Sequence, residues 1–176
     1  MNLLTSSSPL TLWQEVVKQA ENNCSVNLNQ MLEHYLVTLL MRYIAKPEVV
    51  HQVIATNYLH ALSDNKTARL SLQDVGDQCL IFAGLFPRAA EKKLVKISYF
   101  VDLGQGAYAT ISKCANDVYG LLALQFVVLM DVLQSIRQGY DLSPLEAYEQ
   151  WNQVGSERAL KILQSYSNHG VPIKHL

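Results

Sequence analysis

Charged residues are scarce in this chain of 176 residues. Lysine and arginine together number 14, aspartate and glutamate 15, and the charged fraction is 16%, against about 25% in an average soluble domain. The net charge is −1 at pH 7, and no basic stripe is present to neutralise a phosphate backbone, so we expect no nucleic-acid partner. A weakly charged surface tolerates contact with another protein surface, which favours a homo-oligomer or a complex with another protein.

Cysteine is also scarce and odd in number. Cys24, Cys79 and Cys114 are widely spaced, which argues against a disulfide framework and favours reduced, packed thiols in a cytoplasmic protein. Residues 1–15 contain no basic region followed by a sustained apolar run, so no signal peptide is expected. The longest apolar run, 120–130, is too short to cross a bilayer, so we expect no membrane span.

Strand patterns, internal repeats and low-complexity linkers are absent from the sequence, whereas helical periodicity covers most of it. This pattern predicts an all-α fold, a single compact domain of residues 1–176 with about seven helices, in which residues 1–8 form a loose N-terminal arm. The segment 117–138 is apolar on nearly all sides until Asp131, which predicts a central helix. The other predicted helices span 9–21, 27–44, 47–62, 70–86, 98–114 and 144–166.

The last helical segment has the clearest boundary signals. Ser143-Pro144 with Glu146 combines an N-cap, a proline at the first helical position and a capping box. Gly155-Ser156 interrupts the periodic pattern further on. The sequence leaves open whether this pair kinks one helix or separates two.

Two glycine-bearing helical segments flank the proline at position 87. Gly104-Gln105-Gly106-Ala107-Tyr108-Ala109 matches the glycine part of a dinucleotide-binding fingerprint, but that fingerprint needs a preceding strand and a tight turn. Here the glycines fall inside a helical period, so we interpret them as places where another helix comes close. The segments 70–86 and 98–114 are predicted to pack antiparallel, small face against small face, through Gly76, Ala83, Gly104 and Ala107.

Asp74 and Asp77 lie one helical turn apart, on the side opposite the small residues. Together with a further pair of ligands, for which Asp102 and Asp131 are available, they could supply oxygen ligands for Mg²⁺. The simpler interpretation is a solvated polar face, since surface carboxylates are common, and we expect no cofactor and no metal. Glu48-x-x-His51 has the spacing used in di-iron bundles, but the required second pair is absent from the sequence.

A catalytic constellation is also missing. Cys79 and Cys114 are predicted to point into apolar faces, where burial raises the pKa of a thiol and lowers its reactivity, and no catalytic residue is assigned. Two amides, Gln125 and Asn57, fall among apolar residues and are expected to bond to a neighbouring helix or to line a cavity. The candidate ligand-binding residues are Asp74, Asp77, Asp102, Tyr99, Tyr108, Asn57 and Gln125.

Short motifs follow one another in the central part of the chain. They are Gly76-Asp77, Gly84-Leu85-Phe86-Pro87, Ser98-Tyr99-Phe100-Val101-Asp102-Leu103-Gly104 and Ala107-Tyr108. In this pattern the chain resembles an uncharacterised family of bacterial helical proteins. The resemblance implies a bacterial, cytoplasmic, all-α protein, and it supplies neither an activity nor a catalytic residue.

The sequence leaves three functional hypotheses from different classes. The preferred one is a non-enzymatic protein-interaction or regulatory domain that self-associates, because charge is low and a catalytic constellation is missing. The alternative is an enzyme or small-molecule binder with a pocket between helices, lined by Tyr99, Tyr108, Gln125 or Asn57 and by the aspartates. The second alternative is a metal-binding helical bundle.

Overall fold

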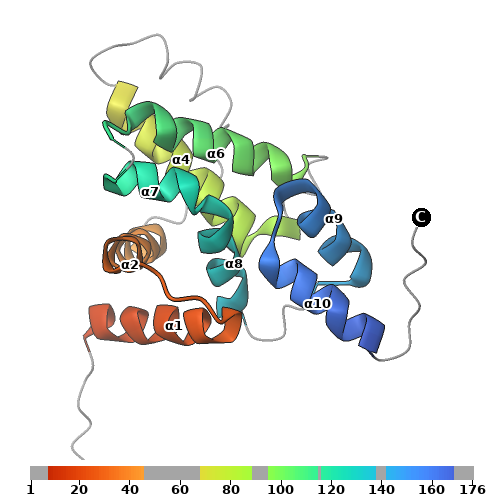
Figure 1. Ribbon diagram of the computed structural model, residues 1–176. Helices are drawn as coiled ribbons and strands as arrows, with labels where there is room; N and C mark the ends of the chain where they lie inside the picture. The colour runs from red at the N-terminus through yellow and green to blue at the C-terminus, as the bar shows by residue number, and fades with distance from the viewer. Residues whose placement is uncertain (1–7, 46–67, 89–94, 115, 138–141, 169–176) are drawn as a thin grey trace, which may run out of the picture.

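A computed structural model describes residues 8–45, 68–88, 95–114, 116–137 and 142–168 (Figure 1). Within these ranges the chain forms eight helices and no strand, which confirms the predicted all-α class. The predicted arm up to residue 7 and the predicted helix 47–62, with Asn57 and Glu48-x-x-His51, lie outside the described residues.

The helices follow one another with short connections where the structure describes them. They are α1 (Pro9–Cys24), α2 (Gln30–Ala45), α4 (Ala68–Leu85), α6 (Ile97–Ile111), α7 (Val118–Leu124), α8 (Phe126–Ile136), α9 (Pro144–Val154) and α10 (Glu157–Asn168). The segment that the sequence left open, 144–166, therefore forms two helices. Gly155, with φ at 72°, ends α9 in the left-handed region that glycine adopts without steric cost.

Local side-chain hydrogen bonds explain where several helices begin. Ser8 Oγ accepts a hydrogen bond from the N–H of Thr11 at the start of α1. At the start of α9 the predicted capping box is confirmed: the Glu146 N–H donates to Ser143 Oγ at 3.3 Å, and the Ser143 N–H donates to Glu146 Oε2 at 2.7 Å. These bonds satisfy N–H groups that have no partner inside the helix.

The apolar segment 117–138 is bent at Gln125. It divides there into α7 and α8, whose axes differ by 76°. Gln125 has φ at −104° and ψ at 19°, while its N–H still reaches the carbonyl of Leu121 at 2.9 Å. The bend places α7 against α6 and α8 against both α1 and α4. The predicted central helix is therefore corrected to a bent pair, because each half of the segment is buried against different neighbours.

No single described helix is both long and apolar enough to cross a bilayer. α7 and α8 reach the necessary apolar length only when they are taken together, across their bend. Both contribute to the interior of the protein, since Leu122 in α7 and Leu129 and Met130 in α8 have no exposed surface.

α4 and α6 run in opposite directions and form the most extensive helix contact among the described residues (Figure 1). Gly76 of α4 faces the ring of Tyr108, and a Cβ at Gly76 would lie 2.5 Å from Tyr108 Cε1. Gly104 of α6 faces Phe126, and a Cβ there would lie 2.5 Å from Phe126 Cε2. Gly104 also brings α6 close to α4, since the same Cβ would lie 2.9 Å from Cys79 Cβ. The expectation of two small faces in direct contact is therefore corrected in part, because each glycine also makes room for an aromatic ring.

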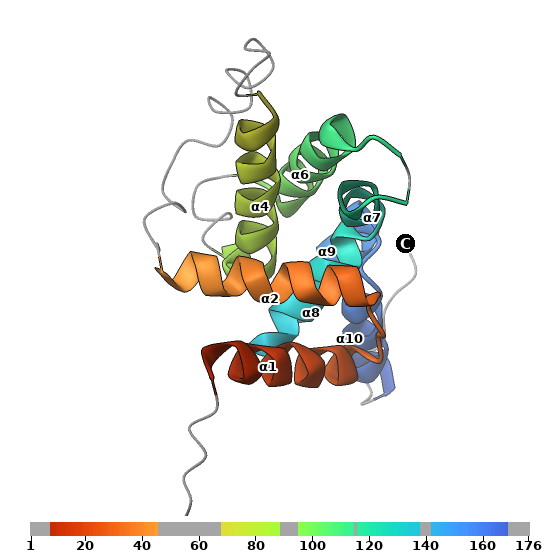
Figure 2. The same ribbon diagram turned by 90° about the vertical axis from the view of Figure 1, so that its left-hand side faces the viewer.

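The apolar core has two parts. The main part is built by α1, α2, α4, α6, α7 and α8, and it includes the fully buried Ala83 and Ala107. Figure 2 shows α1 and α2 side by side, with α4 and α6 on one side of them. A smaller part lies within residues 142–168, which we call the α9–α10 pair, and is formed by Leu142, Ala147, Ala159 and Leu163.

Candidate functional site

A buried carboxylate lies where α2, α4 and α6 meet. Asp77 of α4 is only 5% exposed, and its Oδ1 accepts hydrogen bonds from Tyr35 Oη at 2.7 Å and from Tyr108 Oη at 2.6 Å. Arg42 of α2 donates to Asp77 Oδ2 at 3.0 Å. We call these four residues the Asp77 cluster. Because its donors come from two other helices, the carboxylate connects α4 to both α2 and α6.

Burial and hydrogen bonding act in opposite directions on the Asp77 carboxyl group. Burial raises its pKa, whereas the hydrogen bonds from Tyr108 and Tyr35 and the charge of Arg42 lower it, and the net shift is upward. Burial and the Asp77 charge raise the pKa of the Tyr108 hydroxyl well above its usual value, and burial raises that of Tyr35. Both tyrosines therefore remain neutral hydrogen-bond donors at ordinary pH.

The structure separates the three aspartates that the sequence grouped. Asp77 is buried, while Asp74 on α4 and Asp102 on α6 are exposed. The prediction that Asp77 faces solvent was wrong, because α2 covers that side of α4 and supplies Tyr35 and Arg42. Among the residues that the structure describes, no three His, Cys, Asp or Glu side chains lie close enough together to hold a metal ion.

The other predicted ligand-binding residues are spread over the molecule. Tyr99 is 44% exposed near the start of α6, and Gln125 is half-buried at the bend between α7 and α8. Asn57 lies outside the described residues. Among the described candidates, Tyr108 and Asp77 are the pair that the structure joins by a hydrogen bond.

Two of the three cysteines are buried. Cys79 has no exposed surface, and burial raises the pKa of its thiol. Cys24 donates to Ser135 Oγ at 3.2 Å and to the carbonyl of Asp131 at 3.4 Å. Cys114 is exposed. The prediction that Cys114 points into an apolar face was wrong, because α6 ends before it and the chain has already turned toward α7.

A second buried carboxylate joins α8 to the α9–α10 pair. Asp131 is 4% exposed; its Oδ1 accepts from Ser156 Oγ at 2.6 Å, and its Oδ2 accepts from the N–H of Arg158 at 3.3 Å. Arg158 also donates through Nη1 to Gln134 Oε1 at 3.1 Å. We call these four residues the Asp131 cluster. Burial raises the pKa of Asp131 to about 6, although the hydrogen bonds and the charge of Arg158 lower it.

Sequence reasoning named Tyr108 but missed the donors Tyr35 and Arg42 of the Asp77 cluster and all donors of the Asp131 cluster. Asp131 stands out in the sequence because it ends an apolar run, and a buried carboxylate requires donors. Ser156 follows the helix-ending Gly155, which is a signal for an N-cap, and its Oγ does accept from the N–H of Ala159 at 3.0 Å. No sequence signal connects Ser156 to Asp131, because they come from helices that are separate in the chain.

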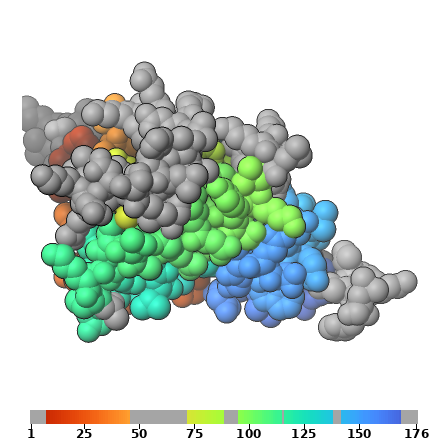
Figure 3. Space-filling model, turned by 90° about the horizontal axis from the view of Figure 1, so that it is seen from above, coloured from red at the N-terminus to blue at the C-terminus, as the bar shows by residue number. Residues whose placement is uncertain are grey.

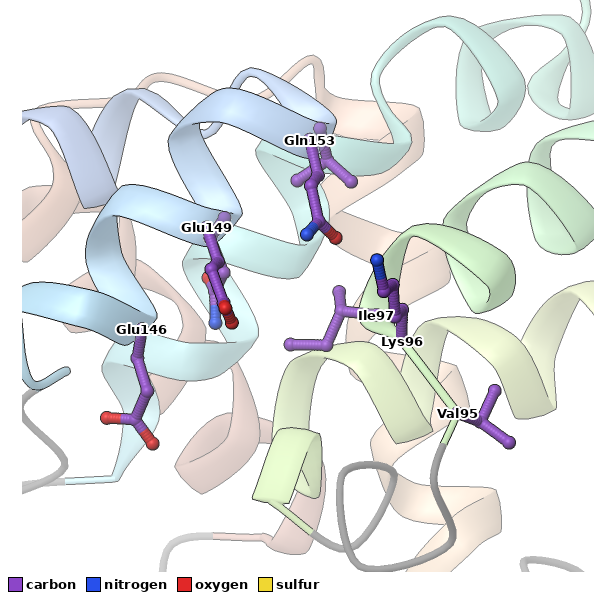
Figure 4. Close-up of a pocket in the computed structure, with 8 residues that line it drawn as sticks. Val95, Lys96, Ile97, Glu146, Glu149 and Gln153 are labelled. Carbon is purple, nitrogen blue, oxygen red and sulfur yellow. The ribbon is translucent and has the colours of Figure 1, made fainter. Parts of the chain in front are cut away.

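A pocket of about 240 Å³ lies between the start of α6 and α9. Figure 4 shows polar side chains on both walls, with Lys96 on the α6 side and Glu149 and Gln153 on α9. Glu146 also lines the pocket and pairs with Arg88, whose Nε lies 3.1 Å from Glu146 Oε1. The lining residues are Val95, Lys96, Ile97, Glu146, Glu149, Gln150, Gln153 and Val154.

An open groove of about 520 Å³ lies between the second half of α6 and α7. Figure 3 shows α6 crossing this side of the molecule, with α7 toward one end and α9 beside the other. Leu124, at the edge of the groove, is 73% exposed, more than any other large hydrophobic side chain described. We call this surface the α6–α7 groove; it is lined by Gln105, Gly106, Ala109, Ser112, Gly120, Ala123 and Leu124.

Comparisons of the chain with protein-family models, with curated proteins and with solved structures give no match. The resemblance to a bacterial helical family therefore stays a prediction. A function for this chain is inferred from the geometry of its clusters and surfaces alone.

Proposed function

We propose that this domain acts through protein contacts and self-associates through the α6–α7 groove. The observation that carries the proposal is the 73% exposure of Leu124 beside a recess lined by small residues. A leucine left in water gives up the roughly 1.5–3 kcal/mol that burial of such a side chain contributes. The surface thus has both a projecting apolar group and a recess that can receive one.

A second copy of the chain fits this surface because the surface is self-complementary. In a dimer with two-fold symmetry, both subunits use the same patch. Leu124 of one copy enters the partner's groove beside Gly106 and Ala109, and symmetry makes the reverse contact at the same time. Small side chains on α6 and α7 allow the two backbones to approach closely.

The charge distribution also supports a second copy of the chain as the partner. None of the described residues that line the groove is charged, and the net charge of −1 leaves little repulsion between two copies. Gln105 and Ser112 supply polar groups at the edges, as in the rim of protein interfaces. Because the groove is small, we expect a transient association that depends on protein concentration.

The buried clusters favour contact over catalysis. Asp77 and Asp131 are buried carboxylates that accept hydrogen bonds from other parts of the protein, and both hold helices together. Their oxygens already accept hydrogen bonds inside the protein. The exposed surfaces are what remains for a partner.

The test is sedimentation velocity over a series of protein concentrations. The unmodified chain is expected to shift from monomer to dimer as its concentration rises. Leu124→Glu is expected to weaken the dimer by about tenfold or more, because it places a carboxylate in an apolar contact. Leu145→Glu is the matched control, since Leu145 is 67% exposed on α9, away from the groove.

A second variant tests the recess of the groove while leaving Leu124 unchanged. Ala109 is exposed on α6, so Ala109→Lys fills the recess without disturbing the core, and we expect it to weaken the dimer as Leu124→Glu does. A strict monomer at every concentration would rule out the proposal. Equal loss of dimer in Leu145→Glu would move the interface to α9 and would also overturn it.

A further inference from the structure

We infer that the pocket between α6 and α9 binds a free amino acid with an apolar side chain. This inference goes beyond self-association, because the pocket lies at the opposite end of α6 from the α6–α7 groove. It rests on the N-terminus of α6, on a buried amide oxygen that lacks a donor, and on opposite charges on the two walls.

The N-terminus of α6 opens on this pocket. Lys96 occupies the N-cap position without a side-chain capping bond, and both Lys96 and Ile97 line the pocket. The first N–H groups of a helix have no partner inside it and carry partial positive charge, so an uncapped start favours an anionic group. The Lys96 ammonium adds a full positive charge to the same wall. A carboxylate is the complementary ligand group.

A buried amide on the opposite wall requires a donor. Gln150 of α9 lines the pocket and is 5% exposed, and its Oε1 has no hydrogen-bond partner among the residues that the structure describes. Buried side-chain oxygens are rarely left without a donor. The oxygen is fully covered in this structure, so the Gln150 amide has to turn toward the pocket, where a ligand N–H group supplies the donor. The ligand therefore carries a donor as well as a carboxylate.

The charges on the two walls also match a ligand of this kind. Glu146 is already paired with Arg88, whereas Glu149 and Lys96 form no ion pair with any residue in the described ranges. Figure 4 shows Lys96 and Glu149 on opposite walls of the pocket. An ammonium near Glu149 and a carboxylate near Lys96 satisfy both walls at once, so a zwitterion fits better than a simple anion.

The size and the apolar lining of the pocket narrow the class of ligand further. A pocket of about 240 Å³ is smaller than the roughly 300–1,000 Å³ that drug-sized ligands occupy. Val95, Ile97 and Val154 supply apolar surface between the charged groups. A single amino acid with an aliphatic side chain fills such a space and covers that surface.

Three probes of similar shape test the ligand class. They are L-leucine, 4-methylpentanoate, which lacks the ammonium, and 3-methylbutylamine, which lacks the carboxylate. Each is titrated into the ¹⁵N-labelled full chain and followed by amide chemical shifts. We expect L-leucine to shift the amides at the start of α6 and in α9, and to bind at least about tenfold more tightly than either analogue, because each analogue leaves one charged wall unpaired.

Two variants test the residues that carry the inference. Lys96→Gln is expected to weaken L-leucine binding by about tenfold, and Lys113→Gln, an exposed lysine beyond the end of α6, is the matched control. Gln150→Leu is expected to abolish binding without lowering the melting temperature, because it removes the unpaired buried oxygen. Preserved folding separates this result from a structural defect.

The outcomes are decisive in both directions. The site is supported if L-leucine shifts only amides at the α6 start and in α9, if Lys96→Gln weakens this binding, and if Gln150→Leu removes it. Absence of shifts with L-leucine, equal binding of 3-methylbutylamine, or an equal loss in Lys113→Gln overturns it. A chain that binds L-leucine and remains monomeric supports this inference and contradicts self-association, so the two proposals fail independently.

Discussion

The Asp77 cluster and the Asp131 cluster are two solutions to the same problem, a carboxylate inside a protein. Asp77 is held by side chains, two tyrosine hydroxyls and a guanidinium, that come from α2 and α6. Asp131 is held by one serine hydroxyl and one main-chain N–H, both at the start of α10. The first arrangement joins three helices within the main core, and the second joins the main body to the α9–α10 pair.

The difference shows what each aspartate stabilises. The α9–α10 pair has an apolar core of its own, so its contact with α8 depends strongly on the Asp131 cluster. The Asp77 cluster is surrounded by apolar groups of the main core, and Tyr35, Tyr108 and Tyr119 pack against one another around it. Loss of Asp77 is therefore expected to affect the whole fold, and loss of Asp131 mainly the α9–α10 pair.

The largest effect is expected from Asp77→Ala. It leaves two tyrosine hydroxyls without an acceptor and Arg42 without its partner, which costs about 3–5 kcal/mol of unfolding free energy. The measurement is urea denaturation, with Asp131→Ala in parallel. We expect the smaller loss in Asp131→Ala, and faster hydrogen exchange there only in α9 and α10. Similar losses of unfolding free energy in both variants would show that the two clusters stabilise equally large parts of the fold.

An intermediate effect is expected from Gly76→Ala. The added Cβ lies 2.5 Å from Tyr108 Cε1, so the ring has to move and its hydrogen bond to Asp77 is strained, at a cost of about 1–3 kcal/mol. Gly155→Ala is the control, because a Cβ there meets nothing within 4 Å and only the positive φ costs energy, about 1 kcal/mol. Thermal unfolding of both variants makes the comparison. An unchanged Gly76→Ala variant would mean that the Tyr108 ring is loosely held.

The smallest effect at neutral pH is expected from Asp131→Asn, which keeps the shape of the side chain. We expect its unfolding free energy at pH 7 to change by at most about 1 kcal/mol, since removal of a buried charge offsets the weaker bond to the Arg158 N–H. Its clearer effect is on the pH dependence of stability.

The sign of that pH dependence follows from the raised pKa. Asp131 titrates at about 6 in the folded chain rather than at its usual 3.8, so the folded state holds the proton more tightly and stability falls as pH rises from about 4 to 6, by up to about 3 kcal/mol. Glu157, Arg158 and the Cys24 thiol are the titratable groups that act on it. Asp131→Asn should reduce this slope, while Asp102→Asn, on the surface of α6, should keep it. The measurement is urea denaturation at several pH values. An unchanged slope of stability against pH in Asp131→Asn would contradict the assignment of this pH dependence to Asp131.

Much of the local structure could be predicted from short segments of the chain. The Ser143 capping box depends on residues within one helical turn, and the helical class depends on a repeating apolar pattern. The burial of Asp77 could not be predicted in this way. The pattern along α4 marks Asp77 as polar, but it contains no information that α2 covers that face with Tyr35, which is 42 positions away in the sequence.

The residues of the candidate sites were also beyond prediction from local sequence patterns. The sequence proposed a pocket around Tyr99, Tyr108 and Gln125, whereas the pocket at the start of α6 uses Lys96 and residues of α9. Lys96 and Glu149 are ordinary charged residues in the sequence, and only the meeting of two helices places them around one space. A site formed between elements that are far apart in the chain has no local signature.

The sequence by itself determined what depends on neighbours in the chain: the helical class, the capping box at Ser143 and the scarcity of charge. The tertiary structure decided the rest. The bend at Gln125, the partners of Asp77 and Asp131, and the two exposed surfaces depend on which helices pack together. Packing is a balance of burial over many residues, and it decides whether a carboxylate meets water, a tyrosine or the start of another helix.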